Sequence, residues 1–229
     1  MIENNSEFPH IYLVPGLGAD GRIFNKLVWR EGIKPTALHW IDPLPEEKTD
    51  DYALRMLEQV DTGNPFVLVG VSLGGIISIE MAKHVMPEKI ILISSIKNKK
   101  ERPFYFTLGR YFKSGVWLPI KHRKLLQLMI GMFFGSISKE QFDSFVEMTN
   151  QFSDNYIKWA ELAIINWDNT TAFSNLTHIH GTSDLIFPKF FIKDHIPVKG
   201  GTHFMIVNRA REIGRILDGL LFQQQTDRL

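Results

Sequence analysis

The sequence contains no cysteine. This absence excludes a disulfide framework, a thiolate nucleophile and a cysteine-ligated metal site. The chain also lacks an excess of either charge, since 26 Lys and Arg stand against 25 Asp and Glu and leave a net charge of +1. That balance gives no reason to expect a nucleic-acid partner.

No apolar run is long and uninterrupted enough to predict a membrane span. Two uncharged stretches come nearest, 62–79 and 125–138. The first is interrupted by glycines and a proline, and the second is shorter than the roughly 18 residues that a spanning helix needs. Residues 1–9 are polar and lack the apolar centre of a signal peptide. We therefore expect a soluble, cytoplasmic protein.

Short apolar runs alternate with amphipathic segments along most of the 229 residues. This alternation predicts an α/β fold, with a parallel six-stranded sheet and helices on both of its faces. Right-handed crossovers predict the spatial strand order 2-1-3-4-5-6. The predicted strands are 10–14, 36–40, 66–69, 90–93, 177–180 and 196–198, and the predicted helices are 22–29, with Asp20 as N-cap, 51–60, 73–85 and 207–221.

The alternation breaks in segment 96–168, where a helical pattern continues without a clear strand. About half of the chain's aromatic residues lie there, and a connection this long is usually a functional insertion. We interpret 1–95 and 169–229 as the α/β core and 96–168 as a helical cap insertion over the site. The cap residues expected to contact an apolar part of the substrate are Met129, Phe133 and Phe134.

The cap also contains a basic stretch. Between Lys97 and Lys124 there are nine Lys or Arg and a single acidic residue, Glu101, with aromatic residues among them. Such a stretch can attract an anionic substrate or a membrane surface, or it can be a solvated face above buried aromatics. We favour the solvated face, and we expect the apolar run 125–135 to line a pocket or the core of the cap rather than a membrane.

The motif Gly70-Val71-Ser72-Leu73-Gly74 lies at the turn from the third predicted strand into a helix. A nucleophile on such a sharp turn has strained backbone angles. The residues two before and two after it must be small, because strand and helix nearly collide there. The N-terminus of the following helix also favours developing negative charge. The motif therefore predicts Ser72 as a nucleophile.

A serine hydroxyl is a weak nucleophile and needs an adjacent base. Asp184 lies in the loop after the fifth predicted strand and His203 in the loop after the sixth, in the chain order serine, acid, histidine. We assign His203 as the general base and Asp184 as the carboxylate that fixes its tautomer. Asp168 and Asp194 are weaker rivals for the acid, since neither lies just past a strand.

An acyl-transfer site also needs hydrogen-bond donors for the oxyanion. The backbone N–H of Leu73, directly after the nucleophile, is one donor. The glycine-rich loop 15–18 supplies the other, which we assign to the N–H of Leu17. His178 and His180 lie two residues apart and could suggest a metal site, but we interpret them as part of a buried strand. Neither a metal nor another cofactor is expected.

Four motifs in this chain resemble those of the α/β-hydrolase superfamily, and the resemblance spans everything except the cap. It implies the α/β-hydrolase fold in a minimal six-stranded form, without the two N-terminal strands of larger members, and the activity of a serine esterase, lipase, thioesterase or C–C hydrolase. Serine at position 72, rather than aspartate, argues against epoxide hydrolases and haloalkane dehalogenases. Pro15-Gly16 stands where many members have His-Gly. The four motifs are 15–18, 70–75, 180–184 and 201–203.

These observations predict a carboxylesterase-like serine hydrolase. It would cleave a small-molecule carboxylic ester or thioester with an apolar moiety, through an acyl-enzyme intermediate. Two alternatives stay open: a C–C bond hydrolase or lyase that uses the same triad, and a non-catalytic ligand-binding protein of the same fold. A covalent serine probe would separate the ligand-binding protein from the enzymes.

Overall fold

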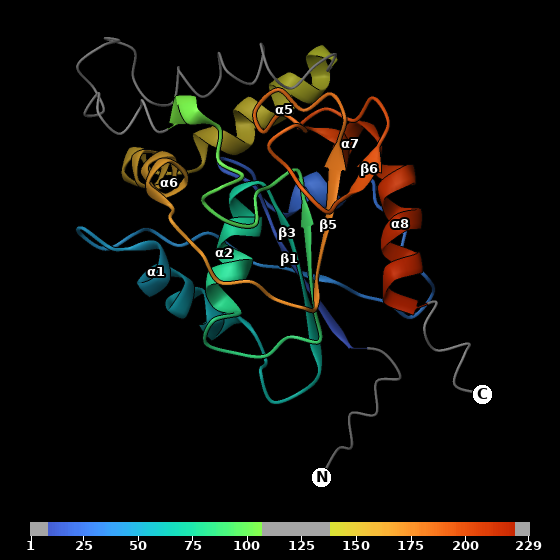
Figure 1. Ribbon diagram of the computed structural model, residues 1–229, viewed down its shortest axis with the longest axis horizontal. Helices are drawn as coiled ribbons and strands as arrows, with labels where there is room; N and C mark the ends of the chain where they lie inside the picture. The colour runs from blue at the N-terminus through green and yellow to red at the C-terminus, as the bar shows by residue number, and fades with distance from the viewer. Residues whose placement is uncertain (1–8, 107–137, 223–229) are drawn as a thin grey trace.

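The computed structural model describes residues 9–106 and 138–222. Its centre is a single parallel sheet (Figure 1). The strands are β1 (His10–Val14), β2 (Thr36–Ala37), β3 (Phe66–Val71), β4 (Lys89–Ile93), β5 (Leu176–Gly181) and β6 (Ile196–Val198). Their order in the sheet is β2-β1-β3-β4-β5-β6, which confirms the predicted order. The winding reverses beside β1 and β3, so the loops after these two strands open onto the same crevice.

Helices cover both faces of the sheet. One face carries α1 (Thr49–Met56), α2 (Leu73–Met81) and α6 (Asp154–Asn166). The 3-10 turn η2 (Leu57–Gln59) extends α1. The other face carries the 3-10 turn η1 (Gly21–Phe24), α5 (Lys139–Asn150), α7 (Met205–Asn208) and α8 (Ala210–Phe222).

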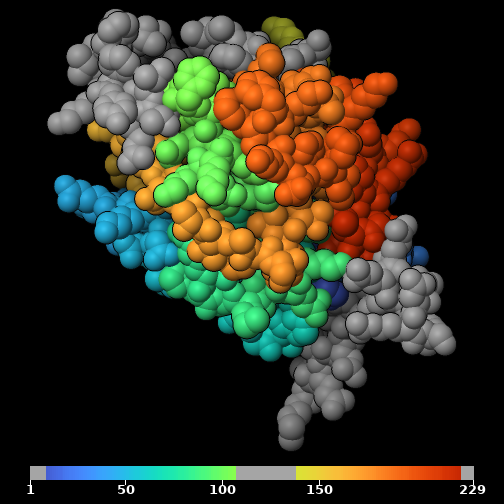
Figure 2. Space-filling model, viewed as in Figure 1, coloured from blue at the N-terminus to red at the C-terminus, as the bar shows by residue number. Residues whose placement is uncertain are grey.

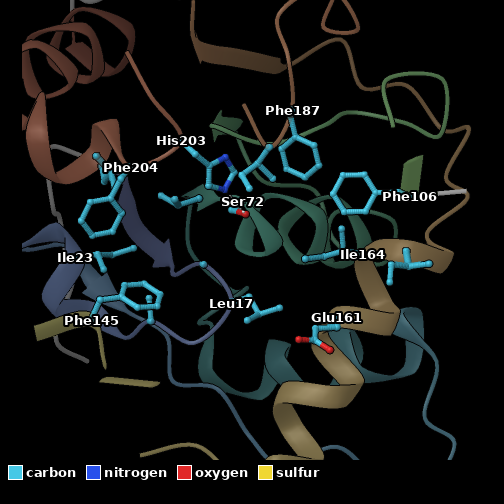
Figure 3. Close-up of a pocket in the computed structure, with 16 residues that line it drawn as sticks. Leu17, Ile23, Ser72, Phe106, Phe145, Glu161, Ile164, Phe187, His203 and Phe204 are labelled. Atoms are coloured by element: carbon cyan, nitrogen blue, oxygen red, sulfur yellow. Dashed lines mark hydrogen bonds between the residues drawn. The ribbon is translucent and has the colours of Figure 1, made fainter. Parts of the chain in front are cut away.

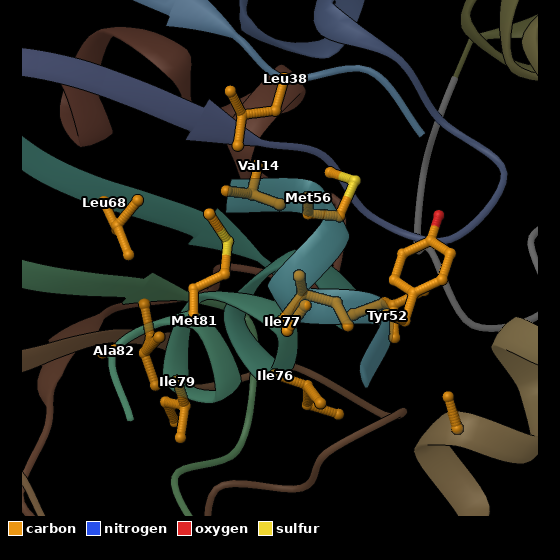
Figure 4. Packing of buried hydrophobic residues seen from close by; sticks show 14 of the residues in the cluster. Val14, Leu38, Tyr52, Met56, Leu68, Ile76, Ile77, Ile79, Met81 and Ala82 are labelled. Carbon is orange, nitrogen blue, oxygen red and sulfur yellow. The ribbon is translucent and has the colours of Figure 1, made fainter. Parts of the chain in front are cut away.

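The two apolar cores follow from the alternation of side chains along each strand. In β1, Tyr12 and Val14 belong to the core on the α2 side, and Ile11 and Leu13 to the core on the α8 side. Figure 4 shows the first core, where side chains of α1 and α2 pack against the sheet. Because both faces are buried, the strands are apolar almost throughout.

Several predicted elements prove shorter than expected. Of the predicted helix 22–29, only η1 is helical. Asp20 does accept a hydrogen bond from the Arg22 N–H, at 2.9 Å, but the bonds that follow it span three residues rather than four, and no α-helix continues. Of the predicted strand 36–40, only Thr36 and Ala37 form a strand, and the Leu38 N–H adds one hydrogen bond to the Leu13 oxygen of β1, at 2.9 Å. The helix expected over 207–221 is broken between α7 and α8, and the one over 73–85 ends at Met81.

The strands point toward the upper end of the molecule in Figure 1, and α5 and α6 lie toward that end. Each of these two helices has a serine N-cap, Ser138 or Ser153, whose side chain accepts a backbone N–H. Both helices belong to the segment expected to be a helical cap. Its residues 107–137, with Met129, Phe133 and Phe134, lie outside the described residues. Within the described ranges, no helix combines the length and apolar character needed to cross a bilayer.

Candidate active site

The turn between β3 and α2 holds Ser72 in a backbone conformation that side chains rarely adopt, with φ 53° and ψ −117°. The neighbouring glycines are needed for close packing. A Cβ at Gly70 would lie 2.4 Å from the Gly74 oxygen, and a Cβ at Gly74 would lie 2.1 Å from the Val14 oxygen. The Ser72 side chain does not cap α2. The turn thus presents the serine hydroxyl at the carboxyl edge of the sheet.

Three side chains from loops far apart in the sequence meet at this edge. His203 Nε2 lies 3.0 Å from Ser72 Oγ, and His203 Nδ1 lies 2.9 Å from Asp184 Oδ2. Figure 3 shows the His203 ring beside Ser72. All three side chains are buried. A carboxylate only accepts hydrogen bonds, so the proton is on Nδ1 and Nε2 can accept the hydroxyl proton of Ser72. The three residues predicted from the sequence are therefore in hydrogen-bond contact.

Asp184 is held as an anion by its surroundings. Its Oδ1 accepts the backbone N–H groups of Ile186 and Phe187, each at 2.9 Å. Burial raises the pKa of this carboxyl group, but the charge and hydrogen bond of His203 outweigh burial, with help from His180 and the Phe187 N–H. The pKa of Asp184 is therefore below its ordinary value. A carboxylate in this state orients an imidazole and stabilises its protonated form.

The two rival carboxylates lie elsewhere. Asp168 and Asp194 are both exposed. Asp194 lies on the loop before β6, where its backbone oxygen accepts a hydrogen bond from the Lys97 ammonium at 3.1 Å. The carboxylate beside His203 is that of Asp184.

The loop after β1 lies against the serine. A Cβ at Gly16 would be 3.6 Å from Ser72 Cβ. Gly18 has a φ of +69°, a conformation that favours glycine. The N–H groups of Leu17 and Leu73 donate no backbone hydrogen bond to the described part of the chain. The assignment of these two groups as oxyanion donors stays a prediction.

Two supporting side chains were not predicted from the sequence. The indole N–H of Trp40 donates to the carbonyls of Ala19 at 3.0 Å and Gly16 at 3.2 Å, which braces the loop after β1. Ser95 Oγ donates to the Ser72 carbonyl at 2.7 Å. Neither residue stands in a recognisable motif, so only the tertiary contacts identify them.

Ser72 and His203 open onto a pocket of about 200 Å³ with a mainly apolar wall. Its walls come from the loops after β1 and β5, from α7 and from α5 and α6 of the cap segment. Figure 3 shows two sides, with Ser72 and Leu17 between them. The first side has Ile23, Phe145 and Phe204, and the second has Phe106, Ile164 and Phe187, with the carboxylate of Glu161 beside them.

Solved structures share this architecture over nearly the whole chain. A carboxylesterase from Nitrososphaera gargenis has a TM-score of 0.64 and 19% identity, over 96% of this chain and 92% of that one. An esterase from Thermogutta terrifontis has a TM-score of 0.63 and 15% identity, over 93% and 90%. An esterase from Exiguobacterium antarcticum has a TM-score of 0.61 and 14% identity, over 93% and 92%. No protein-family model and no curated protein matches the sequence.

This chain has the α/β-hydrolase fold. In this fold a nucleophile stands on the strand-to-helix turn at the top of the sheet, and the acid and the histidine follow it along the chain. Ser72, Asp184 and His203 occupy those three places. Such an arrangement can move a proton from the serine hydroxyl to the imidazole, and the nearby N–H groups can stabilise a negative oxygen. Among the described residues, no group of three or more His, Asp or Glu side chains could hold a metal ion.

Proposed function

We propose that this α/β-hydrolase-fold protein is a serine hydrolase that cleaves an apolar carboxylic ester or thioester through an acyl-enzyme intermediate. One observation carries the proposal. The hydrogen bonds from Ser72 to His203 and from His203 to Asp184, of 3.0 and 2.9 Å, stand beside an apolar pocket. A small molecule with an apolar group next to its scissile carbonyl suits this site.

The first half-reaction forms the acyl-enzyme. Ser72 Oγ attacks the carbonyl carbon while its proton passes to His203 Nε2, and Asp184 stabilises the resulting imidazolium. The carbonyl oxygen becomes negative and accepts hydrogen bonds from the N–H groups of Leu17 and Leu73. When the intermediate collapses, the leaving alcohol or thiol takes the proton from Nε2, and the acyl group stays on Ser72.

The second half-reaction reverses these roles with water. His203 Nε2 removes a proton from the water, the water oxygen attacks the acyl carbon, and the proton returns to Ser72 Oγ as the carboxylic acid leaves. The groups on this chain that take part are the serine, the imidazole, the carboxylate and two backbone N–H groups.

We further propose that segment 96–168 acts as a cap that selects the substrate. The support is that Phe145 on α5 and Ile164 on α6 line the pocket beside Ser72. Apolar walls gain about 0.8 kcal/mol for each methylene group that they remove from water. The cap would then favour substrates with longer apolar groups until the pocket is filled.

The test of the nucleophile is Ser72→Ala. We expect this variant to lose turnover by about 10⁴- to 10⁶-fold and to lose labelling by a fluorophosphonate probe, with its melting temperature unchanged. Turnover is measured on p-nitrophenyl esters and acyl thioesters, and the labelled peptide is located by mass spectrometry. Labelling of Ser72→Ala at the wild-type rate would disprove the assignment.

The test of the base and the acid uses matched variants. His203→Ala should cost about as much as Ser72→Ala, and the double variant little more, because the two residues act as a unit. Asp184→Asn should lower kcat by up to about 10⁴-fold, since the amide favours the wrong imidazole tautomer. Asp194→Asn makes the same chemical change on an exposed carboxylate and should have no effect. A larger loss from Asp194→Asn would contradict the assignment of the acid.

A further inference from the structure

Strand β5 carries a buried histidine that the proposed reaction does not use. His180 is 0% exposed and lies four residues before Asp184. Its Nε2 is 2.8 Å from the carbonyl oxygen of Phe187. A carbonyl oxygen only accepts hydrogen bonds, so the proton is on Nε2. The Nδ1 atom of His180 is buried without a hydrogen-bond partner, so the hydrogen bond from Nε2 to Phe187 is the one that orients this ring.

The protonated edge of this ring also faces the acid. His180 Nε2 lies 3.8 Å from Asp184 Oδ2, the oxygen that meets His203. Burial lowers the pKa of His180, against the opposing effects of the Asp184 charge and of the hydrogen bond to Phe187. The ring is therefore neutral at neutral pH. Asp184 then keeps its full negative charge for His203.

Phe187 connects His180 to the rest of the site. Its N–H donates to Asp184 Oδ1 at 2.9 Å, and its ring centroid lies 5.5 Å from that of His203. On its outer side, this loop also accepts a hydrogen bond from the Tyr105 hydroxyl, at 2.8 Å to the Ile186 carbonyl. Figure 2 shows the segment after β4, in green, lying against the loops after β5, in orange. A bond that fixes the Phe187 carbonyl therefore fixes both the carboxylate and one wall of the pocket.

We propose that His180 is a positioning residue for the proposed triad: its Nε2–H holds the Phe187 carbonyl and thereby holds Asp184 where it orients His203. The inference rests on the proposed function, because it assigns His180 a role in that same site. His180 itself touches neither the substrate nor the reacting atoms. Its contribution is the geometry of the loop after β5.

Other titratable groups surround His180, and the experiment has to distinguish their effects from those of His180. The ring centroids of His178 and His195 lie 5.0 and 5.7 Å from that of His180, and the charge of Lys97 acts on His178. His178 is buried on the same strand, 1% exposed, and neither of its ring nitrogens has a hydrogen-bond partner. Replacement of His178 therefore removes a buried ring without removing a hydrogen bond. This makes His178 the matched control.

The experiment compares three variants on the substrate that the wild type hydrolyses best. His180→Leu removes the donor. His180→Gln places an amide N–H at about the reach of Nε2, and His178→Leu is the control. We expect His180→Leu to lower kcat/KM by about 10- to 100-fold through misplacement of the acid. The acid side of its pH profile should move to lower pH, because a displaced carboxylate stabilises the imidazolium less.

His180→Gln should restore both the rate and the pH profile, and His178→Leu should change neither. A second readout needs no turnover. The proton between His203 Nδ1 and Asp184 Oδ2 gives a downfield ¹H NMR resonance, which should be lost in His180→Leu and kept in the other two variants. This readout stands even if the protein hydrolyses no ester, so the failure of the inference and the failure of the proposed function are distinguishable.

Three results would overturn the inference: an unchanged pH profile and resonance in His180→Leu, the same losses in His180→Gln as in His180→Leu, or an equal shift in His178→Leu. If His180→Leu does not fold, His180→Asn replaces it. That shorter amide reaches about the position of Nδ1 and cannot reach the Phe187 carbonyl. Equal behaviour of the Asn and Gln variants would then count against the inference.

Discussion

The substitution Gly74→Ala tests the link between the packing of β1 against α2 and the chemistry of the site. The added Cβ would lie 2.1 Å from the Val14 oxygen and 2.3 Å from the Pro15 oxygen. Carbon and oxygen atoms almost never approach within 3 Å in this way, so one backbone must move by roughly 1 Å. Both obstructing atoms belong to the main chain and cannot rotate away as a side chain would.

The expected magnitude has two parts. Overpacking of a closely packed region costs about 1–3 kcal/mol, so the free energy of unfolding should fall by that amount. Movement of Val14 and Pro15 also carries the following residues, Gly16 and Leu17, away from Ser72. Loss of one oxyanion donor typically costs about 10²- to 10³-fold in kcat. We therefore expect Gly74→Ala to fold and to retain at most about one hundredth of the wild-type kcat.

Gly214→Ala is the matched control, because it is the same substitution in α8. Its Cβ would have the Val28 oxygen at 3.5 Å as its nearest neighbour, which is an ordinary contact. Replacing a glycine inside a helix by alanine gains about 0.5–1 kcal/mol. This variant should therefore be slightly more stable than the wild type and equally active. Urea unfolding gives the stabilities, and kcat on the best p-nitrophenyl ester gives the activities.

Two outcomes would refute the reasoning. Wild-type stability and kcat in Gly74→Ala would mean that the contact between β1 and α2 relaxes without consequence. A loss of stability with an unchanged kcat would mean that the loop after β1 does not supply an oxyanion donor.

Three further predictions follow from the pocket and the buried histidines. As the acyl chain of the substrate lengthens, kcat/KM should rise by roughly fourfold per methylene until the pocket is full. Ile164→Asn should reduce this rise. Identical profiles for the wild type and the variant would contradict a role of α6 in substrate selection. Hydrolysis should be lost at acid pH, because a histidine base must be neutral to accept the serine proton. A rate that does not depend on pH would contradict a histidine base. Burial lowers the pKa of His178 and His180, so below about pH 6.5 the unfolded chain binds protons that the folded chain does not. The free energy of unfolding should therefore fall with decreasing pH, by at most about 1.4 kcal/mol per pH unit for each histidine. Urea unfolding at pH 7 and pH 5.5 measures this fall in stability, and the fall should be smaller in His178→Leu. Equal stabilities of the wild type at the two pH values would contradict the prediction.

The prediction from sequence succeeds where the physical constraint is local. The turn around Ser72 needs glycine at position 70, where a Cβ would meet the Gly74 oxygen, and this part of the motif is local because β3 and α2 are neighbours in the chain. Segments such as 22–29 fail for the opposite reason. Their apolar spacing suits a helix, but the packing of Ile23 and Phe24 under the sheet and the bonds of Asp20 leave only a 3-10 turn.

Contacts between residues far apart in the chain cannot be predicted from such local patterns. Nothing local shows that Trp40 leaves the sheet to brace the loop after β1, because its indole bonds to carbonyls 21 and 24 residues away. The hydrogen bond from His180 to the Phe187 carbonyl could not be predicted from the sequence either, since a histidine on a buried strand is interpreted as part of the core. In both cases the partner is a backbone carbonyl, which every residue carries and which therefore leaves no signal in the sequence.

The sequence by itself determined the alternation of strands and helices, the strand order and the chain positions of Ser72, Asp184 and His203. These properties depend on the period of apolar residues, on the handedness of crossovers and on glycines beside a sharp turn. Only the tertiary structure decided that these three side chains are in hydrogen-bond contact and which side chains enclose the pocket. Ser72 and His203 stand 131 residues apart in the chain, and a contact over that distance exists only once the sheet has brought the loops after β3 and β6 to the same edge.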